Sequence, residues 1–150
     1  MRPRLLVIVS LLVIAGCVAP SGRPFTATFP EVVLDPDVDV VMEEVPVTLY
    51  DATGLVVSLE ILPERFLGAG WDVEVAETRM VLVQWGGGSC LDQVRIALSR
   101  VAPAGFAIDV EEMASPLMLG CAGVGISRGV VITLNEDVLA EDFVVSVNPQ

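Results

Sequence analysis

The residues that most enzymes use for proton transfer and covalent catalysis are scarce in this chain. The sequence has no histidine, and its eight basic residues are all arginine. A histidine base, a histidine metal ligand and a lysine Schiff base are therefore absent. Residues 125–129 (Gly-Ile-Ser-Arg-Gly) have the spacing of a nucleophile elbow, which needs a strand-turn-helix setting and a base for the serine proton. The pattern of Val130–Leu134 favours a strand instead, so we interpret this segment as a turn before a strand and predict no catalytic residue.

Two other patterns also lack parts of the sites that they resemble. The Trp85–Ser89 run of three glycines has no lysine, which a phosphate-binding P-loop requires. We interpret it as a turn beside Cys90, with Trp85 in the core. Glu43-Glu44 and Glu111-Glu112 are neighbours in the sequence, and neighbours in a strand point to opposite faces. That arrangement does not suit the two carboxylates of a glycoside hydrolase, so we expect no enzyme and place a small hydrolase third among the functions.

Asp35, Asp37 and Asp39 have the first three spacings of a calcium loop. The sixth position of such a loop is glycine and the twelfth is glutamate, but here they are Val40 and Pro46. The segment is typical of a solvated acidic linker, and we predict no metal site and no cofactor. A solute- or ion-binding module of the calcium type is the alternative function.

The overall composition excludes two further classes. The formal net charge is −12, and nucleic-acid binding needs a basic surface, so we expect no nucleic-acid partner. Hydrophobic residues make up 53% of the chain, which excludes an intrinsically disordered protein.

The N-terminus has the features of a secretory signal peptide. Arg2 and Arg4 precede an apolar run from Leu5 to Ala15, broken only by Ser10. As a helix this run would be about 16 Å long, whereas a membrane span needs about 20 apolar residues. It fits the hydrophobic region of a signal peptide better than a membrane anchor.

The four residues Ile14-Ala15-Gly16-Cys17 resemble the lipobox of bacterial lipoprotein precursors, although that motif usually has leucine where Ile14 stands. The resemblance implies that a diacylglyceryl group joins the Cys17 sulfur and that a peptidase cuts between Gly16 and Cys17. Residues 1–16 would then be the signal peptide. Two acyl chains give stable anchoring, so the resemblance implies a lipid-anchored protein on the extracytoplasmic face of the cell membrane.

Cys90 and Cys121 remain once Cys17 is assigned to lipid. Paired cysteines of an exported chain usually form a disulfide, and we predict that these two do. The loop that they close would contribute roughly 3.5 to 4 kcal/mol in the chain-entropy model. Two buried free thiols are the alternative, whereas a zinc site would lack ligands.

Residues 17–44 are predicted to be the lipidated cysteine and an extended acidic tether. Proline favours extended, unpaired backbone, and like charges extend it further. The valines within Val38–Val41 leave open that the end of the tether joins a sheet edge. The prolines are Pro20, Pro24, Pro30 and Pro36.

Residues 45–150 are predicted to form one β domain. Apolar residues alternate with polar ones along several segments, which is typical of strands with one buried face. Val45–Tyr50 and Leu55–Leu62 flank turn residues and predict a hairpin, and Trp71–Ala76 predicts a strand. Met80–Trp85 is almost wholly apolar and predicts a central strand that is buried on both faces.

The second half of the domain continues this pattern. Val94–Ser99 and Phe106–Glu111 predict another hairpin, and Val130–Leu134 and Phe143–Val147 predict two more strands. A helix over Leu91–Val101 is the alternative for one of these segments. About eight strands in about 105 residues favour an all-β fold, a small antiparallel β-sandwich that is immunoglobulin-like in its general architecture, with one disulfide.

Three segments of this domain resemble uncharacterised small secreted or lipid-anchored proteins of high-GC Gram-positive bacteria. They are residues 49–56 (Leu-Tyr-Asp-Ala-Thr-Gly-Leu-Val), 85–90 (Trp-Gly-Gly-Gly-Ser-Cys) and 121–126 (Cys-Ala-Gly-Val-Gly-Ile). The resemblance implies a disulfide-stapled β fold without a known activity. We therefore expect a non-catalytic binding or structural module of the cell envelope, attached to the membrane by lipid, with another envelope protein or the cell wall as its partner.

Overall fold

The structure is a computed structural model that describes residues 22–35, 38–62, 72–87, 90–115 and 126–149. Within these ranges the chain forms nine strands and one short 3-10 helix, η2 (Ala140–Asp142). One sheet has five strands, in the order β1 (Arg23–Asp35), β2 (Val38–Asp51), β6 (Leu91–Val101), β7 (Gly105–Ala114) and β9 (Phe143–Pro149). The other sheet has four, in the order β3 (Val56–Ile61), β8 (Ile126–Leu134), β5 (Met80–Gly87) and β4 (Asp72–Glu77).

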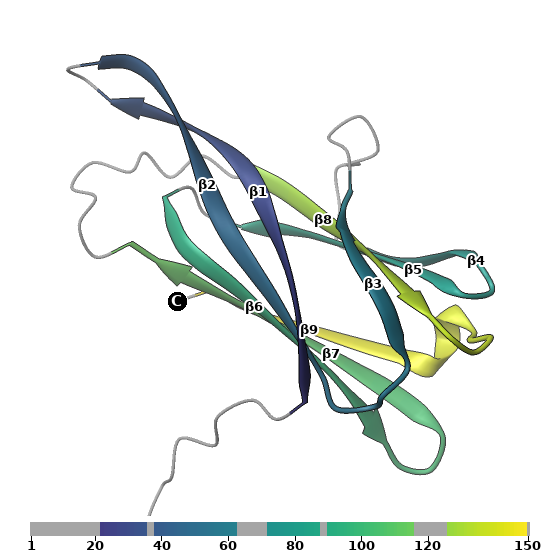
Figure 1. Cartoon of the computed structure of the whole chain (residues 1–150). Helices are drawn as coiled ribbons and strands as arrows, with labels where there is room; N and C mark the ends of the chain where they lie inside the picture. Colours follow the sequence, from purple (N-terminus) through teal and green to yellow (C-terminus); the bar gives the residue numbers. More distant parts are fainter. Residues whose placement is uncertain (1–21, 36–37, 63–71, 88–89, 116–125, 150) are drawn as a thin grey trace, which may run out of the picture.

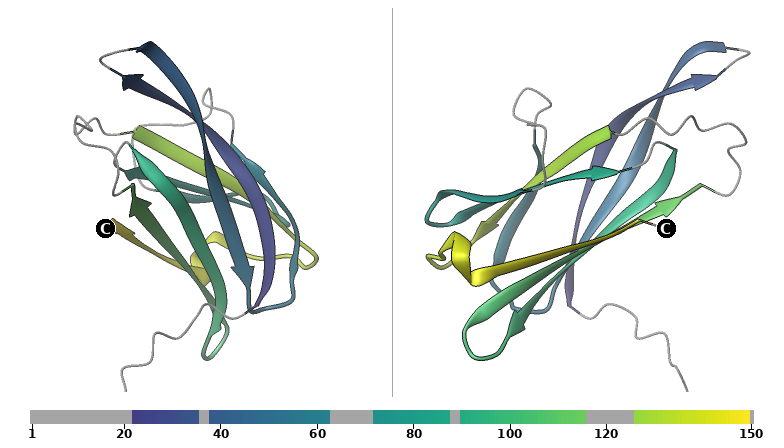
Figure 2. Two further views of the ribbon diagram at one scale, coloured as in Figure 1. Left: turned by 60° about the vertical axis from the view of Figure 1, so that its left-hand side comes forward. Right: turned by 180° about the vertical axis from the view of Figure 1, so that it is seen from behind.

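The two sheets lie face to face, as Figures 1 and 2 show, and this confirms the predicted all-β sandwich. The predicted hairpin in the second half is confirmed, because β6 pairs antiparallel with β7. Residues Leu91–Val101 are therefore a strand and not a helix. The strands predicted over 71–76 and 80–85 are confirmed as the antiparallel pair β4 and β5.

The core lies between the sheets and follows from the alternation of residue types. On β6 the side chains of Val94, Ile96 and Leu98 are buried, whereas the residues between them are partly exposed. The same alternation holds in β5, β7 and β8. Each buried Val, Leu, Ile or Phe side chain contributes about 1.5 to 3 kcal/mol relative to an exposed one, so this one-sided burial holds the sandwich together.

The hairpin predicted between Val45–Tyr50 and Leu55–Leu62 is wrong. β2 and β3 belong to different sheets, with β2 between β1 and β6 and β3 next to β8. The turn after Asp51 carries the chain from one sheet to the other, and the Ala52 amide donates to the Leu98 carbonyl at 2.9 Å. Turn residues mark where a chain reverses but do not specify whether the next strand pairs with the last or stacks over it.

The prediction that all strands pair antiparallel is also wrong for two pairs. β2 runs parallel to β6, and β7 runs parallel to β9. In each case the intervening strands of the chain lie in the other sheet, so the chain re-enters the five-stranded sheet in the same direction.

The predicted tether over residues 17–44 is wrong for Arg23–Asp35 and for Val38 onwards, because these residues form β1 and the first half of β2. The two strands pair along nearly their whole length, from Arg23 opposite Asp51 to Asp35 opposite Val38. Proline is tolerated in an edge strand because its missing N–H faces solvent, and β1 is the edge of its sheet. The prolines therefore did not prevent strand formation.

The prediction for Met80–Trp85 is correct in part. β5 is a central strand, between β8 and β4. Only one of its faces is buried: Val81, Val83 and Trp85 are fully enclosed, whereas Leu82 and Gln84 are partly exposed.

Candidate functional site

Three polar or amphipathic side chains continue the inward-facing rows of the core at one end of the sandwich. On β7 the row Phe106, Ile108, Val110 is followed by Glu112, and on β8 the row that includes Val130 begins with Arg128. On β5 the corresponding row ends with Trp85. Strand alternation places all of these side chains between the sheets.

The three side chains meet at one carboxylate oxygen. Glu112 Oε1 accepts a hydrogen bond from Trp85 Nε1 at 2.9 Å and another from Arg128 Nη1 at 3.0 Å. Trp85 and Arg128 lie opposite each other on the paired strands β5 and β8, whereas Glu112 comes from the other sheet. The contact is therefore a polar bridge across the core of the sandwich, and we refer to these three residues as the core bridge.

The core bridge is shielded from water. The side chains of Arg128 and Glu112 are 4% and 2% exposed. Removing two charges from water costs several kcal/mol per ion, and their attraction offsets this only with good geometry and further hydrogen bonds. In this conformation neither charge is open to a substrate, so the arrangement holds the two sheets in one relative position.

Gly87 is needed because Glu112 approaches the β5 backbone closely. A Cβ built on Gly87 would overlap the Glu112 carboxylate oxygens. Thus the Trp85–Gly87 segment supplies a donor and leaves room for the acceptor. The turn predicted over Trp85–Ser89 is therefore wrong for Trp85–Gly87, which form the end of β5, and residues 88–89 lie outside the described ranges.

Cys90 lies at the same end of the sandwich. Cys90 directly precedes β6 and is 8% exposed. Its backbone carbonyl accepts a hydrogen bond from the Ser115 amide at 3.0 Å. Its φ of +62° is a turn conformation. Cys121, Gly16 and Cys17 lie outside the described residues.

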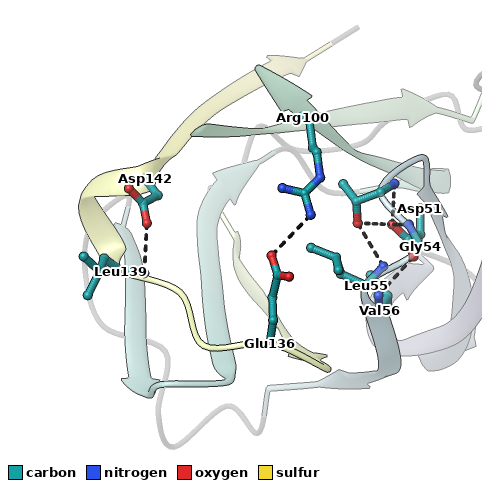
Figure 3. Close-up of polar contacts among 9 residues, drawn as sticks. Asp51, Gly54, Leu55, Val56, Arg100, Glu136, Leu139 and Asp142 are labelled. Carbon is teal, nitrogen blue, oxygen red and sulfur yellow. Dashed lines mark hydrogen bonds and ion pairs between the residues drawn. The ribbon is translucent and has the colours of Figure 1, made fainter. Parts of the chain in front are cut away.

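A second polar cluster lies at the opposite end of the sandwich, around Asp51 (Figure 3). The Asp51 carboxylate accepts from the amides of Thr53, Gly54 and Val56 at 2.8, 3.1 and 3.0 Å, and from Thr53 Oγ1 at 2.6 Å. Burial of Asp51 acts to raise its pKa, but the hydrogen bonds from Thr53, Val56 and Gly54 together outweigh it, and the pKa is lowered. The carboxylate thus fixes the turn between the sheets.

The other residues named in the sequence analysis lie in different parts of the structure or outside the described ranges. Ser127 is exposed within β8, and the strand predicted over Val130–Leu134 is confirmed. The turn predicted over residues 125–129 is wrong for residues 126–129, which already belong to β8, and residue 125 lies outside the described ranges. Trp85 is in the core, as predicted. Asp37 lies outside the described residues, as do the side chains of Asp35 and Asp39.

Sequence reasoning missed the roles of Glu112 and Arg128. Glu112 was considered only as one of a pair of acids, and Arg128 only as part of a serine motif. The signal that reveals them is the alternation itself, because one further step of two residues along β7 or β8 leads from the apolar row to each charge. A carboxylate and a guanidinium at inward positions of facing sheets indicate an ion pair.

Within the described parts of the chain, no three His, Cys, Asp or Glu side chains gather as a metal site would require. No helix in these parts is long and apolar enough to span a membrane. Comparison with protein-family models, with curated proteins and with solved structures finds no match.

Proposed function

We propose that the protein is a lipid-anchored, non-catalytic module of the bacterial cell envelope, exposed on the extracytoplasmic face of the membrane. The observation that carries this proposal is the sequence Ile14-Ala15-Gly16-Cys17 directly after the apolar run that ends at Ala15. In this proposal residues 1–16 are a signal peptide, and Cys17 receives a diacylglyceryl group. Two acyl chains suffice for stable attachment.

The described domain supports a binding or structural task. Its buried charged groups are used within the fold: Arg128 pairs with Glu112, and Asp51 fixes a turn. No histidine or lysine is available for acid–base or covalent chemistry. We infer that the partner is another envelope protein or the cell wall, bound by the surface of the sandwich.

A disulfide between Cys90 and Cys121 belongs to the same proposal. Cys90 and Cys121 are the two cysteines that remain once Cys17 carries lipid, and an exported chain folds in an oxidising compartment where paired cysteines form disulfides. Cys90 precedes β6 of one sheet and Cys121 precedes β8 of the other. The bridge would therefore staple a sandwich of general immunoglobulin-like architecture from sheet to sheet.

The test is expression of the full chain in a bacterium, with Cys17→Ser as the variant and Ser21→Ala as the matched control. We expect the wild type and the control in the membrane fraction and Cys17→Ser in the soluble fraction. Intact-mass measurement of the extracted wild type should show a chain that begins at Cys17 and carries a diacylglyceryl group. If Cys17→Ser stays with the membrane, or if the mass shows no lipid, the proposal is wrong.

A further inference from the structure

One end of the sandwich carries the point where the described chain begins, and we call it the Arg23 end. Arg23 of β1 lies opposite Asp51, the last residue of β2, and Asp51 lies opposite Leu98 near the end of β6. Gly22 is so close to the Asp51 backbone that a Cβ there would overlap it. The hairpin tip after β6, residues 101–105, therefore lies at this same end, as Figure 1 shows at the bottom of the molecule.

The other sheet contributes to the same end. Val56, at the start of β3, lies opposite Leu134, at the end of β8. The Leu134 amide donates to the Arg79 carbonyl of the turn between β4 and β5 at 2.8 Å. The η2 segment completes this end, because Phe143, which follows it, lies opposite Phe106 at the start of β7.

The exposed large hydrophobic side chains of the described residues belong to elements that meet at this end. They are Val57, the second residue of β3; Val101, the last of β6; Leu139, just before η2; and Val144, the second of β9. Their exposed fractions are 58%, 44%, 57% and 67%. Single exposed apolar residues are ordinary, but all four of the large ones among the described residues belong to elements at this one end. Next to Val101 the tip continues with exposed Ala102, Pro103 and Ala104.

The charges at the Arg23 end are largely paired. Arg100 contacts Glu136 at 3.3 Å, and Arg79 contacts Asp137 at 2.9 Å (Figure 3 shows the first pair). The Asp142 carboxylate accepts from the Leu139 amide at 3.2 Å. The cations at this end are Arg23, Arg79 and Arg100, and the acids Glu136, Asp137 and Asp142 lie among them. The other acid of η2, Glu141, is exposed.

The position of the proposed lipid anchor indicates what this surface contacts. Five residues lead from Cys17 to Gly22, and they reach at most about 18 Å when fully extended. A lipid on Cys17 therefore holds the Arg23 end within that distance of the bilayer, which is shorter than the sandwich is long, because β2 alone has 14 residues at about 3.3 Å each.

We propose that the Arg23 end, which carries Val57, Val101, Leu139 and Val144, rests on the lipid bilayer with the exposed tip 101–104 nearest the acyl boundary. This inference depends on the proposed lipid anchor at Cys17. The far ends of β1 and β9 then point away from the membrane, toward the partner (Figures 1 and 2). The occupant is the membrane that holds the anchor and not a separate protein.

The experiment uses full-length chains, extracted from bacterial membranes and reconstituted into phosphatidylcholine vesicles that contain nitroxide-labelled lipid. One variant, Ala102→Cys, carries a fluorescent maleimide at the Arg23 end, and the matched variant, Asn148→Cys, carries it near the end of β9. Both positions are exposed. The wild type, treated in the same way, shows whether the native cysteines react.

We expect several-fold stronger quenching of the label at residue 102 than at residue 148. Adding Leu139→Glu to the first variant should reduce this quenching, whereas Ser127→Glu, at an exposed position of the far end, should leave it unchanged. Equal quenching at the two labels in a chain of lipidated mass, or no effect of Leu139→Glu, overturns the orientation alone. A chain recovered without lipid in the soluble fraction overturns the anchor and, with it, the orientation.

Discussion

Glu112 and Arg128 show how a single charge at an inward position changes what a strand can pack against. Each sits where the alternation of its strand calls for an apolar side chain. Each is tolerated because the other is 3.0 Å away on the facing sheet and because Trp85 donates to the same oxygen. Since both are almost fully buried, either one alone would be an uncompensated charge in the core.

Glu112→Gln should therefore be strongly destabilising. Glutamine keeps the shape and an acceptor for Trp85 but leaves the Arg128 charge buried without its counter-ion, which costs about 3 to 5 kcal/mol. Urea unfolding followed by Trp fluorescence measures the difference. Glu60→Gln, the same change at an exposed position of β3, should shift the free energy of unfolding by about 0.5 kcal/mol or less.

A double variant separates loss of the charge pair from loss of shape. Adding Arg128→Met to Glu112→Gln removes the unpaired charge, so most of the lost stability should return, because replacing a buried ion pair by neutral groups is often close to neutral. If the double variant is as unstable as Glu112→Gln alone, the pairing of the charges is not what stabilises the core bridge.

At the scale of the element, the turn between β2 and β3 depends on one carboxylate. Asp51 accepts hydrogen bonds from three amides and one hydroxyl. Asp51→Asn replaces one acceptor by a donor, and the buried amide that then lacks a partner costs about 1 to 3 kcal/mol. Urea unfolding at pH 7 should show this loss, whereas Asp92→Asn, at an exposed position of β6, should not.

The same variant should differ from the wild type in its dependence on pH. The pKa of Asp51 is lowered in the folded state, so the unfolded chain takes up this proton first as the pH falls. The contribution of Asp51 is therefore complete above its ordinary pKa, about 3.9, and is lost as the pH falls through its lower folded value. The stability difference between Asp51→Asn and the wild type should shrink below pH 4. A constant difference down to pH 2 would contradict this assignment.

β1 is an element of the sandwich and not a tether, and Phe29 is the residue that tests this. Its side chain is 6% exposed and meets the Trp85 ring edge-on, with ring centroids 5.8 Å apart. Phe29→Ala should cost about 3 to 5 kcal/mol, as is usual for a buried Phe. Thr26→Ala, at an exposed position of the same strand, should cost little. Equal and small effects of both substitutions would indicate that β1 does not pack on the core.

The elements could be predicted from the sequence more completely than their partners. Alternation depends on neighbouring residues, so it located β4, β5, β6 and β7, but it left open a helix over Leu91–Val101, which the pairing of β6 with β7 excludes. Which sheet a strand joins depends on contacts between distant residues, such as Tyr50 opposite Ala97. The chain between Asp51 and Val56 contains ordinary turn residues in either case, so the sequence could not distinguish a hairpin from a crossing between sheets.

At the scale of the whole molecule, the two ends of the sandwich differ. The end near Trp85 and Glu112 holds the core bridge and also Cys90. The Arg23 end holds the exposed large apolar residues and Gly22, the first described residue after Cys17 in the chain. The sequence alone could predict the lipid anchor as a motif. It could not show which part of the surface lies nearest the proposed anchor, because only the strand register places Val57, Val101, Leu139 and Val144 at the same end of the sandwich.

The proposed disulfide concerns the whole molecule because it would join the segment before β6 to the segment before β8, and these two strands belong to different sheets. It closes a loop of about 30 residues, for which the chain-entropy model gives about 3.5 to 4 kcal/mol. In a Cys17→Ser background, which removes the lipid, reduction should lower the free energy of unfolding by about that amount. The double variant Cys90→Ala/Cys121→Ala should have the lower stability with or without reductant. If reductant leaves the Cys17→Ser chain unchanged while its free-thiol count is two, Cys90 and Cys121 are not bonded to each other. The two sheets are then held together only by their packing and by the core bridge.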